Sequence, residues 1–474
     1  MAQLADIGVI GLGVMGAALA RNFHSRGLAV TTWNREDDMS QAFAAKYGDA
    51  RLTVQPTLPD FVRGLEAPRR IILMVTAGRP VDLVLEALAP HLGAEDIVVD
   101  GGNTFFRDTV RREEWCRAHG FRFVGMGISG GEEGALKGPA MMPGGDVEAW
   151  QRLRPVLEAA CAQSDHGPCV DHCGSGGAGH YVKMVHNGIE YADMQIISEI
   201  WTLLAGGLGI TGKAASDVFA AWNNTELRSY LVEVTALVLA VKDPQTGGPL
   251  VDQILDAAGQ KGTGRWTVEQ GLELGIPLPT LAAAVDARGV SSNLAARKHG
   301  SALFGGRPMG ALAGLTVDDL RHAFYAARIA SYSQGFQLLQ AASVAHDFGA
   351  NLAAVSRIWT AGCILRAALL DRLYEALLRD AKLELLHHDP NLAAALSASL
   401  PSLRKTVARA MESGYAIPCL SSALTWLDGL ATGRGSAALI QAQRDCFGAH
   451  TYKRVDAPDV AVHSLWADMD KIEG

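Results

Sequence analysis

The sequence predicts a doubly wound α/β sheet, followed by a large all-α domain and an extended C-terminal tail. Short apolar runs alternate with helix-like segments over the first part of the chain, the pattern of a mostly parallel sheet. From His180 to about Thr432, Ala and Leu recur at helical spacing, and after Phe447 this periodicity is weak. We therefore expect domains at residues 1–178, 179–433 and 434–474.

The first segment of the chain combines a strand with a glycine-rich turn. Asp6–Ile10 is an apolar strand candidate, a helix is expected through about Arg26, and Ala29–Trp33 is the second strand candidate. The turn between the first strand and the helix has the G-x-G-x-x-G pattern, with Gly11, Gly13, Met15 and Gly16. In this context the pattern predicts a Rossmann-type dinucleotide site, with the pyrophosphate at the helix N-terminus.

Further buried strands are expected at 70–75, 97–100 and 121–124, with helices at 81–91 and 109–119 between them. Cys169–Cys173 is interpreted as the last strand. The same region holds His166, His172 and His180, but its Cys-x-x-x-Cys spacing lacks a second pair of ligands. We therefore expect no metal.

The second strand is followed by residues that choose between coenzymes. Asn34 and Arg35 stand where an arginine would hold the 2'-phosphate of NADP. Three acids follow, Glu36 to Asp38, and their charge opposes a phosphate unless they point to solvent or begin the next helix. These residues favour NADP and leave NAD open.

Two turns after later strands are candidate ligand loops. Asp100–Thr104 places Asn103 where open parallel sheets bind ligands, although a simple glycine turn is an equal alternative. In the second loop, Gly130 and Gly131 follow Ser129 and can expose backbone amides to a carboxylate or phosphate.

The segment from Gly174 to Tyr191 leads from a glycine-rich loop into a helix with a polar face. Lys183, His186, Asn187 and Glu190 fall at helical spacings i, i+3, i+4 and i+7. An acid and a base could thus flank one small substrate. An ordinary exposed helix with spaced charges would show the same pattern, so the spacing alone does not decide.

Bulk composition narrows the class of protein. The 474 residues are 49% hydrophobic and 19% charged, as in globular proteins with a large core. A net charge of -8 argues against a nucleic-acid partner. Seven cysteines scattered along the chain, with no secretory or membrane-spanning segment in view, favour a cytoplasmic location and no membrane partner.

Isolated basic residues in the second half are usually solvated surface. The Lys261-Gly-Thr263-Gly loop is more specific, because glycines let the backbone and the ammonium approach a phosphate closely. Arg288, Arg444 and His450 are the other candidates.

Together these motifs resemble the 6-phosphogluconate dehydrogenase family. The resemblance runs from the first strand to the tail in the family's order. It rests on Gly11–Gly16, Asp100–Asn103, Ser129–Gly134, Met142–Gly145, Gly179–Tyr191, Lys261–Gly264 and Phe447–Tyr452.

The resemblance implies oxidative decarboxylation of 6-phosphogluconate to ribulose 5-phosphate and CO2, with NADP and no metal, in the pentose phosphate pathway. It implies that Lys183 is the general base and Glu190 the general acid. Further matches are expected around the coenzyme at Val75 and Ala77, and around the sugar at Asn103, Ser129, Gly130, Gly131, His186 and Asn187. The substrate phosphate would lie among Tyr191, Lys261, Thr263, Arg288 and Arg444.

The resemblance also implies a homodimer in which the tail crosses to the partner subunit, so that Arg444 and His450 complete the partner's site. The helical domain would consist of two similar units, and a faint internal echo, with Val218 before Trp222 and Val355 before Trp359, fits that expectation.

The sequence departs from the family around the coenzyme. Gly13 replaces an alanine, Thr76 replaces a lysine, and acids follow Arg35. An NAD-preferring form of the same enzyme therefore stays open. A non-decarboxylating 3-hydroxyacid dehydrogenase would leave Lys261, Arg288, Arg444 and His450 without a phosphate to bind. A catalytically silent protein would not need both Lys183 and Glu190.

Overall fold

The structure, a computed structural model, describes residues 3–306 and 310–466. Its contacts divide the chain into two compact units, Met1–Leu424 and Thr425–Gly474.

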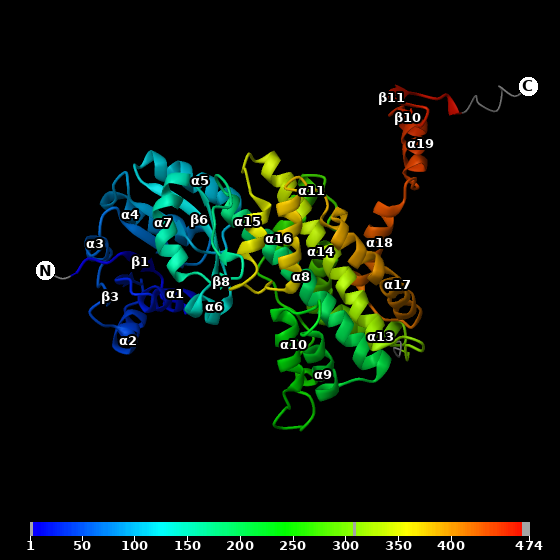
Figure 1. Cartoon of the computed structure of the whole chain (residues 1–474), viewed down its shortest axis with the longest axis horizontal. Coiled ribbons are helices and arrows are strands. Elements are labelled where there is room, and N and C mark those ends of the chain that lie inside the picture. The colour runs from blue at the N-terminus through cyan, green and yellow to red at the C-terminus, as the bar shows by residue number, and fades with distance from the viewer. Residues whose placement is uncertain (1–2, 307–309, 467–474) are drawn as a thin grey trace, which may run out of the picture. The chain divides into compact units, whose positions relative to one another are not determined.

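The first unit begins with a seven-stranded sheet (Figure 1). Its strand order is β3-β2-β1-β4-β5-β6-β7, and every neighbouring pair is parallel except β6 and β7. The order reverses beside β1, and this arrangement confirms the doubly wound sheet. The strands are β1 (Ile7–Ile10), β2 (Val30–Trp33), β3 (Leu52–Val54), β4 (Arg70–Leu73), β5 (Ile97–Asp100), β6 (Arg122–Ser129) and β7 (Ala140–Gly145).

Helices cover both faces of this sheet. Side chains of one face, such as Leu19 and Trp150, pack against Val9 in one core, and those of the other face, such as Phe61 and Leu85, pack against Ile10 in a second core. Consecutive residues of β1 thus serve opposite cores, as the strand pleat requires. The helices are α1 (Val14–Ser25), α2 (Asp37–Tyr47), α3 (Leu58–Arg63), α4 (Arg79–Leu88), η1 (Ala89–His91), α5 (Phe106–Ala118), α6 (Gly131–Lys137) and α7 (Val147–Ala160).

The structure corrects the expected end of the sheet. Cys169–Cys173 is not a strand, and only Val170 forms an isolated bridge, to Met141 of β7. The last strand is instead β7, which pairs antiparallel with β6. Two short strands, β8 (Gln163–Ser164) and β9 (Gly167–Pro168), form a separate ribbon.

The long helix α8 (Ala178–Thr202) begins the helical part and confirms the helix expected from Tyr181 onward. It packs against β6 and β7 on one side and against α11, α12 and α14 on the others. A fully buried ion pair between Asp193 of α8 and Arg328 of α14, at 2.8 Å, joins the two longest helices.

The remaining elements of this part are helical. They are η2 (Leu203–Gly207), α9 (Gly212–Trp222), α10 (Tyr230–Ala240), η3 (Leu250–Gln253), α11 (Thr263–Glu273), α12 (Pro279–Ser292), α13 (Leu294–Leu303), α14 (Val317–Ala345), α15 (Leu352–Ile358), α16 (Ala368–Arg379), η4 (Leu386–His388), α17 (Pro390–Glu412) and α18 (Pro418–Ala431).

The two segments that follow Trp222 and Trp359 meet each other. The amide of Tyr230 donates to the carbonyl of Arg366 at 3.0 Å, and the amide of Ala368 donates to the carbonyl of Arg228 at 2.9 Å. This reciprocal pairing is what a local two-fold relation between similar units would produce.

The second unit has more regular structure than the sequence indicated. It contains α19 (Ala437–Gly448) and an antiparallel hairpin of β10 (Tyr452–Arg454) and β11 (Ala457–Val462). Buried Asp445 organises it by accepting hydrogen bonds from the amides of Thr451 and Ser464 and from the indole of Trp466.

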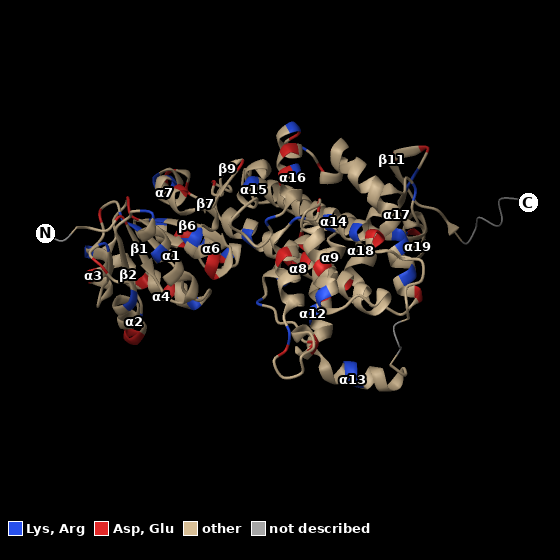
Figure 2. Cartoon of the chain, turned by 60° about the horizontal axis from the view of Figure 1, so that its bottom comes forward, with Lys and Arg blue, Asp and Glu red and all other residues tan. Residues whose placement is uncertain are grey.

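Charge is spread without a large field of one sign. Basic and acidic residues alternate along the ribbon (Figure 2). Of the helices described, none has both the length and the apolar character needed to span a bilayer. All seven cysteines are free thiols, six of them buried.

Candidate active site

The polar face of α8 is pressed against the edge of the sheet. A Cβ atom on Gly127 of β6 would lie 2.3 Å from Cβ of Lys183, closer than real side chains approach. Gly179 makes a similar close approach, since its Cβ would meet the carbonyl of Gly125 at 2.3 Å. Glycines therefore let α8 and β6 touch along their backbones, which places Lys183 beside the end of β6.

A chain of hydrogen bonds connects the other residues of this face. Ser129 Oγ and His186 Nε2 are 3.3 Å apart, His186 Nδ1 and Asn187 Oδ1 are 3.2 Å apart, and Asn187 Nδ2 donates to Thr263 Oγ1 at 3.2 Å. Because an amide oxygen only accepts, His186 carries its proton on Nδ1 and accepts at Nε2 from Ser129. These hydrogen bonds fix the orientations of the four side chains.

Burial shifts the pKa values of the two candidate catalytic groups in opposite directions. Desolvation lowers the pKa of Lys183, which is only 7% exposed, and the nearby Glu190 carboxylate opposes this shift. Desolvation raises the pKa of Glu190, against the opposing charges of Lys183 and Arg288. Both pKa values therefore move toward neutral pH, which favours a neutral amine at Lys183 and a protonated carboxyl at Glu190. Burial also holds the pKa of His186 well below its ordinary value, so this ring is neutral.

Glu190 lines a cavity of about 520 Å³ between α8 and the start of α11. The lining includes part of the predicted set, together with residues that the sequence did not indicate. It comprises Asn103, Asn187, Glu190, Tyr191, Met194, Gly259, Gln260, Lys261, Thr263 and Arg288.

The basic end of this cavity is organised by Tyr191. The guanidinium of Arg288 lies 3.5 Å from the centre of the Tyr191 ring, and the amide of Lys261 approaches the Tyr191 hydroxyl at 3.4 Å. A Cβ on Gly264 would lie 2.6 Å from the same ring, so α11 packs directly on it. One ring therefore holds two cationic residues at one end of the cavity, a suitable place for an anionic group.

The predicted Ser129-Gly130-Gly131 loop is tighter than expected. Strand β6 continues through Ser129, and α6 begins at Gly131. Gly130 joins them with a φ of 126°, and a Cβ there would lie 2.5 Å from the carbonyl of Gly362. Only glycine fits this turn between Ser129 and α6.

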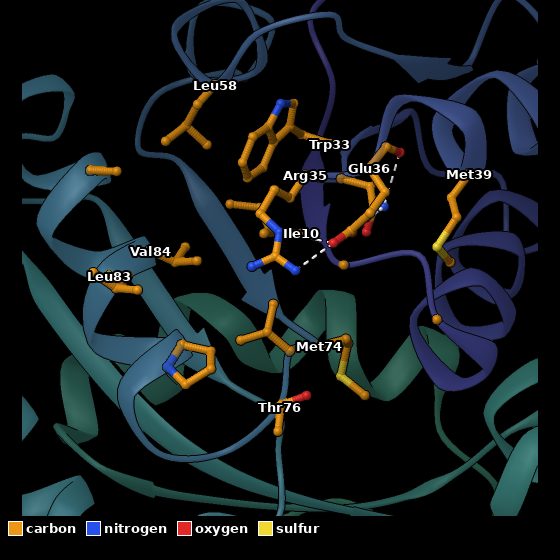
Figure 3. A pocket seen from close by; sticks show the side chains of 16 residues that line it. Ile10, Trp33, Arg35, Glu36, Met39, Leu58, Met74, Thr76, Leu83 and Val84 are labelled. Atoms are coloured by element: carbon orange, nitrogen blue, oxygen red, sulfur yellow. Dashed lines mark hydrogen bonds and ion pairs between the residues drawn. The ribbon is translucent and has the colours of Figure 1, made fainter.

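A second cavity, of about 560 Å³, lies at the carboxyl ends of β1, β2 and β4 (Figure 3). The glycine turn forms part of its wall. Gly11 has a φ of 97°, and a Cβ on Gly16 would lie 1.9 Å from the Gly11 carbonyl, so both glycines shape the turn itself. A Cβ on Gly13 would meet no protein atom within 4 Å, which leaves its open side for a ligand. These features fit a pyrophosphate beside the N-terminus of α1.

Of the predicted coenzyme residues, the second cavity is lined by Gly11, Gly13, Asn34, Arg35 and Val75. The rest of that set lies elsewhere. Met15 packs against the core, Gly16 is buried in the turn, Ala77 follows the lining residue Thr76, and Asn103 lines the other cavity.

The sequence did not point to the apolar part of the coenzyme cavity. Trp33, Leu58, Leu83 and Val84 form it from three separate elements (Figure 3). Leu83 on α4 is 50% exposed, so an apolar side chain is left uncovered at this part of the cavity wall.

Arg444 and His450 belong to the second unit, and their part in the site stays a prediction. Arg444 is exposed on α19 and donates to Gln441 at 3.1 Å, and His450 is exposed after the same helix. The His and Cys run has separate partners: His166 contacts Asp371, His172 contacts the carbonyl of Gly145, and His180 contacts Thr109.

The doubly wound sheet, the glycine turn at the coenzyme cavity and the separate polar cavity beside α8 define a dehydrogenase of the Rossmann class with a helical substrate domain. Comparisons with known proteins narrow this class. Residues 6–174 match the NAD binding domain of 6-phosphogluconate dehydrogenase, and residues 179–466 match the C-terminal domain of the same enzyme. The chain belongs to the 6-phosphogluconate dehydrogenase family.

Individual relatives cover nearly the whole chain. The decarboxylating 6-phosphogluconate dehydrogenase of Synechococcus elongatus is 46% identical over 98% of this chain and 99% of its own. The NADP(+)-dependent decarboxylating enzyme of Bacillus subtilis is 44% identical over 97% of this chain and 99% of its own. A solved structure of Plasmodium falciparum 6-phosphogluconate dehydrogenase, studied in apo form, with NADP+ and with 6-phosphogluconate, superposes with a TM-score of 0.94. It has 39% sequence identity and covers 97% of this chain and 100% of its own.

Proposed function

We propose that this protein oxidises and decarboxylates 6-phosphogluconate to ribulose 5-phosphate and CO2, with NADP as the coenzyme. The observation that carries the proposal is the cavity in which Glu190 and Asn187 face Lys261 and Arg288. It offers the carboxyl group of Glu190 for proton transfer and the cationic side chains of Lys261 and Arg288 for a phosphate. The full-length relatives named for this reaction support it.

Lys183 is proposed as the general base. Its lowered pKa lets the neutral amine accept the proton of the 3-hydroxyl group while the C3 hydrogen leaves as hydride. Bound NADP supplies the hydride acceptor. As an ammonium, Lys183 then donates a hydrogen bond to the new 3-keto oxygen and stabilises the charge that develops when the bond between C1 and C2 breaks.

Glu190 is proposed as the general acid. Departure of CO2 leaves an enediol, whose terminal carbon becomes C1 of ribulose 5-phosphate and needs one proton. Glu190, whose pKa is raised by burial, carries that proton at a higher pH than an exposed carboxyl would. The two groups are seven residues apart, two turns of α8, and so reach one substrate from different positions along the helix.

The remaining site residues are proposed to hold the sugar. His186, Asn187 and Ser129 form a connected set of donors and acceptors for the hydroxyl groups. Asn103 and the amides after Ser129 serve the carboxylate end, and Tyr191, Lys261, Thr263 and Arg288 serve the phosphate.

The phosphate-binding role is tested by comparing 6-phosphogluconate with gluconate. We expect kcat/KM with NADP to be at least about a thousandfold higher for the phosphorylated substrate, because Lys261 and Arg288 would have no anionic partner when gluconate is bound. Equal values for the two acids would rule out a phosphate clamp and favour a dehydrogenase of non-phosphorylated hydroxyacids.

We also propose a homodimer in which the tail of one subunit completes the site of the other. The tail unit exposes large apolar side chains, including Leu439, Ile440 and Phe447 on α19, which calls for a covering surface. It also carries Arg444 and His450, the two predicted site residues outside the first unit. A cytoplasmic location stays a prediction that the free thiols support.

A further inference from the structure

The carboxylate of Glu36 is bound to the two residues expected to read the coenzyme's ribose. Its Oε1 atom accepts from Nε and Nη2 of Arg35 at 2.8 and 2.5 Å, and its Oε2 atom accepts from Nδ2 of Asn34 at 3.1 Å (Figure 3). Glu36 lines the coenzyme cavity together with both partners. The arginine that would pair with a 2'-phosphate therefore already has an anionic partner.

The position of Glu36 is set by the fold. It follows β2, where dinucleotide-binding sheets place an acid to bind the ribose hydroxyls of NAD. Asn34 links it to the glycine turn, since Asn34 Oδ1 accepts from the amide of Leu12 at 2.9 Å. Glu36 is thus held at the ribose end of the cavity and not merely near it.

The other two acids of this segment do not share these contacts. Asp37 and Asp38 lie in the first turn of α2, are exposed and do not line the cavity. Their charges favour the helix N-terminus, an ordinary structural role. Of these three acids, Glu36 is therefore the one that can act directly on a bound coenzyme.

We propose that Glu36 sets the coenzyme selectivity of this protein. It competes with the 2'-phosphate of NADP for Arg35 and accepts a hydrogen bond from the 2'-hydroxyl of NAD, so it narrows the preference for NADP. Arg35 is 82% exposed at its side chain and can turn from Glu36 to a phosphate, but the carboxylate then faces that phosphate across a few ångströms. The hydrogen bond with Arg35 lowers the pKa of Glu36, which keeps the carboxylate charged at neutral pH. The inference deepens the proposed function at its coenzyme site.

The test measures binding of two fragments that differ only in the 2'-phosphate, adenosine 2',5'-bisphosphate and adenosine 5'-monophosphate, by calorimetry. We expect Glu36→Gln to lower the Kd of the bisphosphate about five- to tenfold and to leave the monophosphate Kd unchanged or raised. Asp37→Asn removes the same charge one residue away and should change either Kd less than about twofold. Full-length NADP and NAD, titrated in the same way, should follow the two fragments.

Three results would overturn the proposal. If Glu36→Gln and Asp37→Asn lowered the Kd of the bisphosphate by the same factor, the effect would come from the net charge of the segment and not from the position of Glu36. Equal changes for both fragments in Glu36→Gln would show no selectivity at the 2' position. Full retention of the gain in a double variant with Arg35→Ala would exclude competition for Arg35. Unchanged melting temperatures establish that each variant is folded. Fragment binding needs no turnover, so this test stands even if the proposed reaction is not found. A negative result in this test would likewise leave the proposed reaction untouched.

Discussion

At the scale of single residues, the chemistry depends on what burial does to Lys183 and Glu190. The helix spacing brings them into one site, but spacing is common on exposed helices. Their opposite pKa shifts arise because packing, with β6 against Lys183 and α11 against Asn187, removes the polar face of α8 from water. The sequence could predict which residues share that face, because helical periodicity fixes it. The burial of the face depends on contacts that are distant in sequence.

Removal of Lys183 should abolish catalysis without loss of coenzyme binding. We expect Lys183→Ala to lower kcat about a thousandfold or more, because the general base is lost, while the NADP Kd measured by calorimetry stays within about twofold. Lys213→Ala is the control, an exposed lysine of α9 paired with Asp217. Residual activity near that of the control would remove Lys183 as the base.

The pKa shifts predict a bell-shaped dependence of rate on pH. The rate should rise with pH as Lys183 loses its proton, and fall at higher pH as Glu190 loses the proton that it must donate. In Glu190→Gln we expect kcat to fall about a hundredfold or more and the high-pH decline to disappear. Stopped-flow detection of NADPH can separate hydride transfer from later steps. A high-pH decline that persists in the variant would assign it to another group.

At the scale of elements, the site depends on the close approach of α8 to the sheet. The strands with strong apolar patterns were predictable, whereas β7 was not, because its Met142-Pro-Gly-Gly145 sequence is depleted in strand-forming residues. The cavity wall formed by Leu58 and Val84 was also out of reach of local patterns, since it joins α3 to α4.

A methyl group at Gly127 should separate β6 from α8. We expect Gly127→Ala to lower the free energy of unfolding by about 1–3 kcal/mol through overpacking and to reduce kcat by displacing Lys183. Gly289→Ala is the matched control, since a Cβ there, in α12, meets no atom within 4 Å. That change should leave stability equal or raise it by about 0.5–1 kcal/mol. Urea unfolding compares the two, and equal effects would show that the contact at Gly127 is not limiting.

Glu199 of α8 predicts a dependence of stability on pH. It is buried and accepts the amides of Cys419 and Leu420, at the start of α18, at 2.9 Å each. Burial raises its pKa to about 7, against the opposing effect of these hydrogen bonds. The stability that comes from this raised pKa is fully present at low pH. It is lost as the pH rises from about 4.5, the pKa in the unfolded chain, through about 7, the pKa in the folded protein.

Replacement of Glu199 tests this assignment. Glu199→Gln cannot ionise, so its stability should change less than that of the unmodified protein between pH 5 and pH 8. Thermal unfolding across this range is the measurement. Parallel pH profiles for the two proteins would show that Glu199 does not titrate there.

At the scale of the whole molecule, each active site of the proposed dimer contains residues from both subunits. Within the tail, the hydrogen bonds that Asp445 accepts from His463, Ser464 and Trp466 outweigh its burial and lower its pKa to about 2. The tail is thus organised internally, although several of its large apolar side chains are exposed. Sequence periodicity missed α19 and the hairpin, because polar contacts with Asp445 and not an apolar core hold them.

Mixed dimers of two inactive variants test tail exchange. Lys183→Ala and Arg444→Ala, refolded together in equal amounts, should form hybrids in which one site has an intact body and an intact partner tail. We expect about a quarter of the unmodified activity, since half of the dimers are hybrids and each has one working site of two. If Arg444 served its own chain, no hybrid site would be intact and the mixture would stay inactive.

The central claim, that Lys183 and Glu190 support oxidation followed by loss of CO2, is tested most directly by product stoichiometry. The protein is supplied with 6-phosphogluconate labelled at C1 and with NADP, and NADPH and labelled CO2 are measured in one reaction. We predict equal amounts of the two products, with ribulose 5-phosphate as the remaining product. NADPH without CO2, or no turnover of the phosphorylated substrate, would contradict the account.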